Sequence, residues 1–146
     1  ANIMLARDGR VVLIDFGAVR IVGSEHTTVG VGSVGYAPLE VLAGEEVGPE
    51  SDIYELGNTL HEMLTGKLPP PASQRKHGWR ADYLPAPWRA LVESALTIRQ
   101  DARPKDVFRW WNSVNWDAWE KNLRARGEDP ELTKKMPRES LAALWN

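Results

Sequence analysis

The sequence predicts an α+β domain that begins with a small β-hairpin and is otherwise mainly helical. Apolar residues at positions 3–5 and 11–14 enclose an Asp8-Gly9 pair, and Asp-Gly is typical of a tight two-residue hairpin turn. Residues 18–35 are rich in Gly, Ser, Thr and Val without a sustained period, which predicts a long loop. Helical periodicity dominates from residue 52 onward.

The strongest helical pattern begins at Asp52. Asp52 and Glu55 have capping-box spacing, and Gly66 suits the C-terminal end of a helix. The apolar residues of this segment are expected on one face: Ile53, Leu56, Leu60, Met63 and Leu64. We therefore expect a helix from Asp52 to about Gly66.

Two later helices are predicted to open with a proline in the first turn. Pro87 precedes an apolar pattern made by Trp88, Leu91, Val92, Ala95 and Leu96. Pro104 precedes a pattern made by Val107, Phe108, Trp111 and Val114. From Asn115 the sequence becomes more charged but keeps tryptophans, which favours short amphipathic helices.

Composition limits the classes of function. The 146 residues are 42% hydrophobic and 26% charged, with a formal net charge of 18 − 20 = −2, so neither nucleic acid nor an acidic membrane is expected as a partner. The absence of cysteine excludes disulfides, thiolate metal sites and a cysteine nucleophile. No apolar run approaches the ~20 residues of a membrane span, and no signal peptide is evident, so we expect a cytoplasmic protein.

The first chemical motif is Asp15-Phe16-Gly17, which directly follows the second apolar stretch. Alone, it is more often only a turn that ends a strand. The segment from Asn2 to Gly17, however, resembles Hanks-type (eukaryotic-like) protein kinases between the end of the catalytic loop and the Asp-Phe-Gly motif. The resemblance implies that Asn2 and Asp15 hold Mg²⁺ and, through it, ATP. Their amide and carboxylate oxygens are the hard ligands that magnesium prefers, although Asn2 could instead be a terminal residue without a role.

The segment from Gly32 to Glu40 resembles the end of a kinase activation segment, which would span residues 15–40. Ser33 stands where the family has Thr. The resemblance implies that its hydroxyl contacts the catalytic loop and that Ser or Thr is the substrate residue. Pro38-Leu39 departs from the family's Ala-Pro, whereas Glu40 keeps its place. Thr27 and Thr28, with Ser24, are candidate phosphorylation sites, although loop hydroxyls are more often simply solvated.

Two further motifs complete the resemblance. Asp52 begins a segment similar to the family's central helix, in which the Asp binds backbone amides of the catalytic loop; a simple N-cap role is equally compatible. Asp101-Ala102-Arg103-Pro104 resembles the late Arg-Pro motif. It implies an architectural pair between Arg103 and Glu40, which we expect to be buried, so that loss of either partner should cost ~3–5 kcal/mol.

Four motifs in family order over residues 2–114 identify the chain as similar to a serine/threonine protein kinase, with Trp79, Tyr83 and Leu84 suggesting a bacterial member. The resemblance implies a kinase-like fold, residues 1–114 forming part of the C-lobe and 115–146 a helical, charged extension. The parent enzyme would transfer the γ-phosphoryl of ATP to Ser/Thr hydroxyls of a protein substrate.

The general base and the ATP-binding N-lobe are expected upstream of Ala1, so the isolated chain is expected to be inactive. Its uncovered lobe face makes self-association plausible. Two alternatives remain open. The chain could belong to a pseudokinase-like module that binds partners. It could also be an unrelated helical interaction domain, which would have no hairpin before residue 20.

Overall fold

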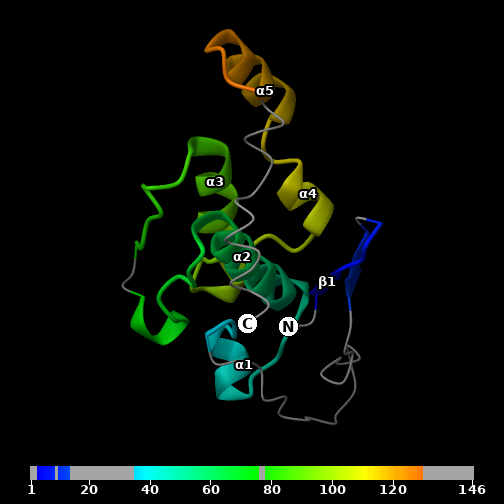
Figure 1. Ribbon diagram of the computed structural model, residues 1–146. Helices are drawn as coiled ribbons and strands as arrows, with labels where there is room; N and C mark the ends of the chain where they lie inside the picture. The colour runs from blue at the N-terminus through cyan, green and yellow to red at the C-terminus, as the bar shows by residue number, and fades with distance from the viewer. Residues whose placement is uncertain (1–2, 9, 14–34, 76–77, 130–146) are drawn as a thin grey trace.

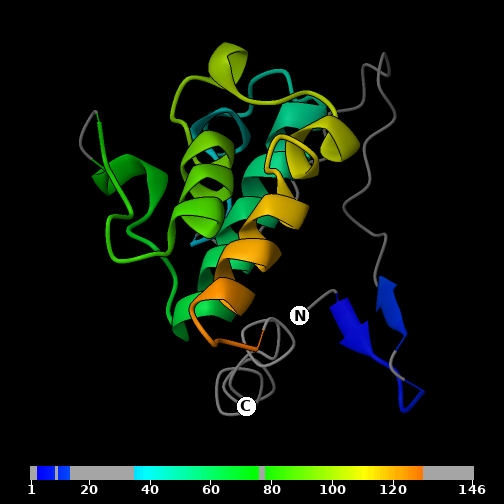
Figure 2. The ribbon, with the colours of Figure 1, turned by 90° about the horizontal axis from the view of Figure 1, so that it is seen from above.

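The computed structural model describes residues 3–8, 10–13, 35–75 and 78–129 (Figure 1). In chain order the elements are β1 (Ile3–Leu5), β2 (Val11–Leu13), α1 (Leu39–Ala43), α2 (Pro49–Thr65), the 3₁₀ helix η1 (Ala72–Gln74), α3 (Ala86–Ala95), the 3₁₀ helix η2 (Gln100–Ala102), α4 (Val107–Trp111) and α5 (Trp116–Ala125). The helices gather around α2, and the hairpin lies to one side of them in both views (Figures 1 and 2). This is the mixed, mainly helical architecture that the sequence predicts.

The hairpin forms, but its turn differs from the predicted one. β1 and β2 pair antiparallel with Ile3 opposite Leu13 and Leu5 opposite Val11. The Ala6 amide also donates to the Arg10 carbonyl (2.8 Å), so three residues rather than two connect the paired positions. Asp8 stabilises the tip, because its carboxylate accepts hydrogen bonds from the Arg10 amide (3.1 Å) and the Arg10 Nε (2.7 Å). The hairpin contradicts the alternative of an unrelated helical interaction domain, which would have no hairpin before residue 20.

The central helix α2 begins earlier than predicted. Gly48 is its N-cap and Pro49 lies in the first turn, because a proline there has the required φ and no amide to leave unpaired. Asp52 therefore lies inside the helix, and the predicted capping box is wrong. The predicted C-terminal end is right, since Gly66 has a φ of 72° and its amide donates to the Glu62 carbonyl (2.7 Å). In the described part of the chain, no helix is long and apolar enough to cross a bilayer.

The core lies mainly between α2 and α3, which make extensive contact. Pro87 lies in the first turn of α3, as predicted. Three of the predicted α3 residues, Leu91, Val92 and Ala95, are fully buried. On α2 the predicted face holds for Ile53 and Leu60 but not for Leu56, which is 39% exposed. Instead, buried polar side chains occupy much of α2: Ser51, Asn58 and His61.

A cluster of tryptophans joins α3, α4 and α5. Trp88 of α3 lies 4.9 Å from Trp116 and 5.9 Å from Trp119 between ring centroids. Trp111 stacks on Trp116 at 4.8 Å. These contacts bury large aromatic surfaces, so the ring packing stabilises α5 against the rest of the helices.

The prediction for α4 is wrong in two respects. The helix begins at Val107, with Asp106 as N-cap accepting from the Arg109 amide (2.8 Å), so Pro104 precedes it rather than opening it. Its buried residue is Trp110, whereas Phe108 is 76% exposed. The helix is only five residues long, and the indole of its buried residue donates to the Leu91 carbonyl of α3.

Candidate functional site

A buried ion pair joins α1 to the segment that precedes α4. Glu40 lies in the first turn of α1, and Arg103 is the C-cap of η2. Arg103 Nη1 donates to Glu40 Oε1 (2.5 Å) and Nη2 to Oε2 (3.1 Å), so the contact has the two-point geometry that a guanidinium and a carboxylate favour. The side chains are 0% and 4% exposed. The expected contact between Arg103 and Glu40 is therefore present and buried.

The remaining polar atoms of this pair are also satisfied. Ser51 Oγ of α2 donates to Glu40 Oε1 (2.8 Å). Arg103 Nε donates to the Thr97 carbonyl (2.6 Å) and Nη2 to the Ile98 carbonyl (2.8 Å). The Arg103 guanidinium also lies 4.7 Å from the centroid of the Tyr54 ring. The pair thus fixes α1, α2 and the loop after α3 at one point.

The electrostatics of Glu40 reflect two opposed effects. Burial raises the pKa of its carboxyl, because the charged form is poorly solvated. Hydrogen bonds from Arg103 and Ser51 favour the charged form and outweigh burial, so the net pKa of Glu40 lies below its ordinary value. Glu40 is accordingly held as a carboxylate at neutral pH.

A second set of contacts holds the end of the predicted activation segment against α2. The Tyr36 hydroxyl donates to the Glu62 carboxylate. Asn58 Nδ2, from a side chain only 1% exposed, donates to the Tyr36 carbonyl (2.8 Å). Burial, followed by the neighbouring Glu62 charge, raises the pKa of the Tyr36 hydroxyl, so the tyrosine stays neutral and remains a donor.

Asp52 occupies a different environment. It lies in the first turns of α2, yet within the described part of the chain no hydrogen bond or ion pair engages its side chain. Partial desolvation raises the pKa of Asp52. Desolvation, followed by the negative charges of Asp52 and Glu40, raises the pKa of Glu55. Both side chains keep substantial solvent exposure, so these shifts do not indicate carboxylates sealed in the core. The two acids make one exposed, acidic edge of α2.

The other predicted site residues lie outside the described residues. These are Asn2, Asp15, Ser33, Thr27 and Thr28, together with Ser24. The structure therefore brings together Glu40 and Arg103 and places Asp52 on the same helix as Ser51. The roles assigned to the remaining residues stay predictions.

Several contributors to the site were missed by reasoning from the sequence. Ser51, Tyr54 and Asn58 lie on successive turns of α2 and all contact the segment around Glu40 or its partner. Polar residues at such helical spacing within an apolar segment are a usable signal, because a buried polar side chain requires a hydrogen-bond partner. Nothing in the sequence pointed to Glu62 as the acceptor for Tyr36.

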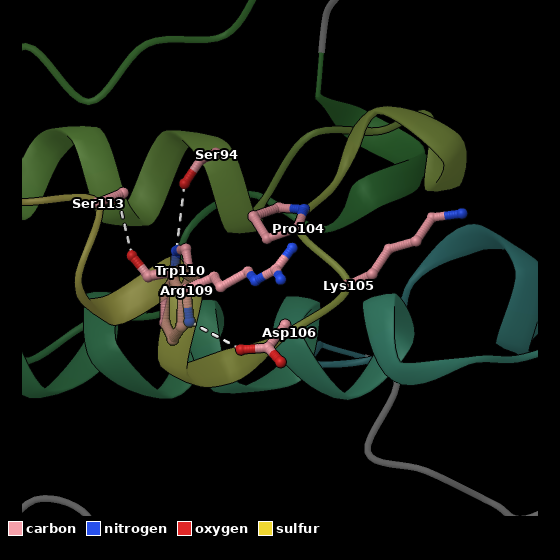
Figure 3. Close-up of a pocket in the computed structure, with 7 residues that line it drawn as sticks. All are labelled: Ser94, Pro104, Lys105, Asp106, Arg109, Trp110 and Ser113. Carbon is pink, nitrogen blue, oxygen red and sulfur yellow. Dashed lines mark hydrogen bonds between the residues drawn. The ribbon is translucent and has the colours of Figure 1, made fainter.

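A cavity of about 360 Å³ lies at α4, away from this site (Figure 3). Three of its polar wall residues, Ser94, Asp106 and Ser113, serve the packing of α4. Asp106 caps the helix, Ser113 donates to the Trp110 carbonyl (2.7 Å), and the Trp110 indole donates to Ser94 Oγ (3.2 Å). These contacts are structural, and the cavity supplies no group to the residues around Glu40.

Comparison with known proteins agrees with the four motifs. Residues 1–122 match the family described as the protein kinase domain. The serine/threonine-protein kinase PknK of Mycobacterium bovis is 38% identical over 110 residues, covering 73% of this chain and 9% of the relative. Serine/threonine-protein kinase A of Synechocystis is 32% identical over 128 residues, covering 73% of this chain and 25% of the relative. The chain therefore spans a quarter or less of the length of these two kinases.

A solved structure shows the same fold. The protein titled "PpkA-294 apo form" superimposes with a TM-score of 0.58 at 29% identity, covering 76% of this chain and 42% of that one. The chain therefore spans less than half of that structure. Motif order, sequence relatives and fold agree, and the chain belongs to the protein kinase family, among the Hanks-type serine/threonine kinases that include bacterial members.

Proposed function

We propose that the chain supplies the C-lobe scaffold, in residues 1–114, of a serine/threonine protein kinase that transfers the γ-phosphoryl of ATP to a protein hydroxyl. The observation that carries the proposal is the buried contact between Arg103 and Glu40. It ties the end of the predicted activation segment to the helices, which is the arrangement that a substrate-positioning segment requires. Phosphoryl transfer depends chiefly on positioning and charge stabilisation, so a rigid anchor of this kind serves the chemistry directly.

The donor chemistry of Asn2 and Asp15 fits magnesium, because both supply hard oxygens. The two residues lie in sequence just beyond Ile3 and Leu13, the paired outer ends of the hairpin. In this proposal the hairpin spaces the Asn2 amide and the Asp15 carboxylate as ligands. Bound magnesium would bridge the phosphates of ATP and offset their negative charge.

Three other residues have proposed positioning roles. The exposed Asp52 carboxylate would accept hydrogen bonds from catalytic-loop amides, which agrees with its lack of another partner in the described residues. The Ser33 hydroxyl would contact the same loop. Phosphorylation of Thr27 or Thr28 would add negative charge to the activation segment and change its order.

The isolated 146 residues are proposed to be inactive in phosphoryl transfer. The sequence contains no His-Arg-Asp motif, whose Asp is the general base in the family. A general base alone contributes ~10²–10⁴-fold to rate, and loss of nucleotide positioning would add to that deficit. Incubation of the purified chain with radiolabelled ATP and a generic protein substrate tests this, and incorporation above that of a boiled sample would refute it.

The proposed kinase function is tested in a full-length protein that carries this segment. Asp15→Asn should abolish transfer while the thermal unfolding midpoint stays unchanged, because the amide keeps the size of the carboxylate but loses its charge. Asp8→Asn, in the exposed hairpin tip, is the matched control and should retain turnover. Full activity of Asp15→Asn would rule out its metal role.

The alternative is a pseudokinase-like module that binds protein partners through the helical lobe. The intact scaffold around Glu40 supports this reading as well as it supports an enzyme, since the scaffold itself does no chemistry. A full-length protein that shows no transfer, and whose partner binding is the same with and without the Asp15→Asn substitution, would favour the module. We also propose that the protein is cytoplasmic and that this chain self-associates. Analytical ultracentrifugation of the chain tests the self-association.

A further inference from the structure

A buried arginine outside the site described above has two unused donors. Arg75 follows η1 and is only 8% exposed. Its Nη2 donates to the Tyr54 hydroxyl, but Nε and Nη1 are buried without a hydrogen-bond partner. Among the described residues, these are the only buried side-chain nitrogen or oxygen atoms left in that condition. Buried polar groups in folded proteins are nearly always paired, so the two nitrogens call for an acceptor.

The charge of Arg75 is also uncompensated. Its guanidinium lies 5.0 Å from the Tyr54 ring centroid and 5.3 Å from that of Trp79, contacts that offset part of the charge but supply no hydrogen-bond acceptor to Nε or Nη1. Arg103 lies against the same Tyr54 ring, and Glu40 already neutralises Arg103. Arg75, Arg103 and Glu40 together therefore carry one net positive charge. Burying a charge without a partner is costly.

A cavity of about 180 Å³ adjoins this arginine. Its wall includes Arg75, Gly78, Trp79, Glu93, Thr97 and Arg99. The one carboxylate in the wall is already engaged, since Glu93 accepts from the Ala81 amide (2.8 Å) and pairs with Arg80 Nε (3.1 Å). Arg75 and Arg99 are the wall cations, and the Arg99 guanidinium already donates to the exposed Asp101 carboxylate. One water needs only ~10–15 Å³ of such space, so a small tetrahedral ion fits together with water.

We propose that this cavity binds a phosphate-type oxyanion, with the Arg75 Nε and Nη1 groups as its main donors and Arg99 at the rim. Both nitrogens are sealed from solvent, so in this proposal the half-buried Trp79 ring, which lies 5.3 Å from the guanidinium and belongs to the wall, moves aside for the ion to reach them. The same chemistry is offered by free phosphate and by a phosphoryl group on a serine side chain. The inference does not rest on the proposed kinase function, because none of the predicted catalytic residues takes part.

Nuclear magnetic resonance on the ¹⁵N-labelled chain tests the proposal. Inorganic phosphate, titrated over the millimolar range at constant ionic strength, should shift the Trp79 indole and the Thr97 and Arg99 amide signals to saturation. Trp79→Phe assigns the indole signal. Chloride should give no saturable shift. Free phosphoserine is the second arm: tighter binding than phosphate assigns the site to a carried phosphoryl group, and equal or weaker binding assigns it to the free ion.

Two variants separate Arg75 from general cation effects. Arg75→Gln should weaken phosphate binding by about tenfold or more, whereas Arg126→Gln, at an exposed pair with Glu128, should leave it unchanged. Equal loss in both variants, or no saturable shift in the unaltered chain, overturns the proposal. If Arg75→Gln does not fold, the Arg75 Nε–H signal of the unaltered chain decides. It must shift with phosphate, and an unshifted signal refutes the site.

Discussion

Gly57 of α2 lies against Ala95 of α3 so closely that a Cβ atom on Gly57 would come within 2.6 Å of the Ala95 Cβ. Leu96 would approach the same atom at 3.2 Å through its Cδ2. The absence of a side chain at position 57 therefore sets the spacing of the two helices that form the core. Gly57 is also the glycine of the segment similar to the kinase central helix. The close contact gives a steric reason for glycine at this position.

Gly57→Ala is expected to destabilise the chain despite the better helix propensity of alanine. The propensity gain is about 1 kcal/mol, but overpacking costs ~1–3 kcal/mol, and the Ala95 Cβ cannot move without its backbone. Urea unfolding should show the loss in the free energy of unfolding. Ala95→Gly in the same chain removes the clashing atom and should restore much of it. A Gly57→Ala variant as stable as the parent would contradict the close contact.

Glu40→Gln should reduce the free energy of unfolding by ~3–5 kcal/mol, because it leaves the buried Arg103 charge without a counter-charge. The matched control is Asp101→Asn, which removes a carboxylate from the exposed pair with Arg99. Exposed pairs contribute under ~1 kcal/mol, so the control should change little. Chemical denaturation of both variants measures the difference. Similar small losses in the free energy of unfolding would show that the Glu40 pair contributes no more than an exposed pair.

His61 should make stability fall on mild acidification. Burial lowers the pKa of its imidazole, whose Nδ1 lies 2.8 Å from the Lys67 carbonyl and whose Nε2 lies 2.5 Å from the Tyr83 hydroxyl. The unfolded chain then binds the proton at higher pH than the folded chain, so the free energy of unfolding falls as the pH drops below ~6.5 and through the lowered folded-state pKa.

The variant His61→Gln isolates this effect. Its free energy of unfolding should depend less on pH between about 7 and 5 than that of the parent chain, because His26 and His77 are common to both. Thermal unfolding at a series of pH values measures the slopes. Identical slopes in the two proteins would exclude His61 as the group responsible.

Trp110→Ala should cost ~3–5 kcal/mol, the range for removing a buried aromatic side chain. The ring is 3% exposed, and its indole donates to the Leu91 carbonyl (3.1 Å). Phe108→Ala, two residues earlier on α4, removes a ring that is 76% exposed and should be close to neutral. Differential scanning calorimetry of both variants tests the contrast. A larger loss for Phe108→Ala would mean that the predicted rather than the observed face of α4 is buried.

The sequence predicted elements where local chemistry decides the structure. Gly66 ends α2 because a residue with positive φ is needed there, and Pro87 lies in the first turn of α3. The sequence reasoning failed where two local signals competed and where a helix was too short to show its buried face. Asp52 and Glu55 have capping-box spacing, but Gly48-Pro49 begins the helix one turn earlier. α4 is too short for its periodicity to distinguish Trp110 from Trp111 as the core residue.

The candidate site was predictable to the extent that a motif records it. The contact between Glu40 and Arg103 followed from the order of two motifs, although 63 residues separate them. The third partner, Ser51, and the aromatic ring of Tyr54 did not follow, because their roles depend on how α2 is rotated against α1 and η2. The two unpaired nitrogens of Arg75 could not be predicted from the sequence for the same reason, since burial arises only from the assembled fold.

The buried pair between Glu40 and Arg103 closes a loop that contains α1, α2 and α3. Because both ends of that loop meet at one contact, neither can detach without breaking the other's anchor. Amide protons across residues 40–103 should therefore exchange with solvent as one cooperative block, with a shared opening free energy. Asn58 and Glu62 hold Tyr36 against α2, so the anchored region should extend back to that residue.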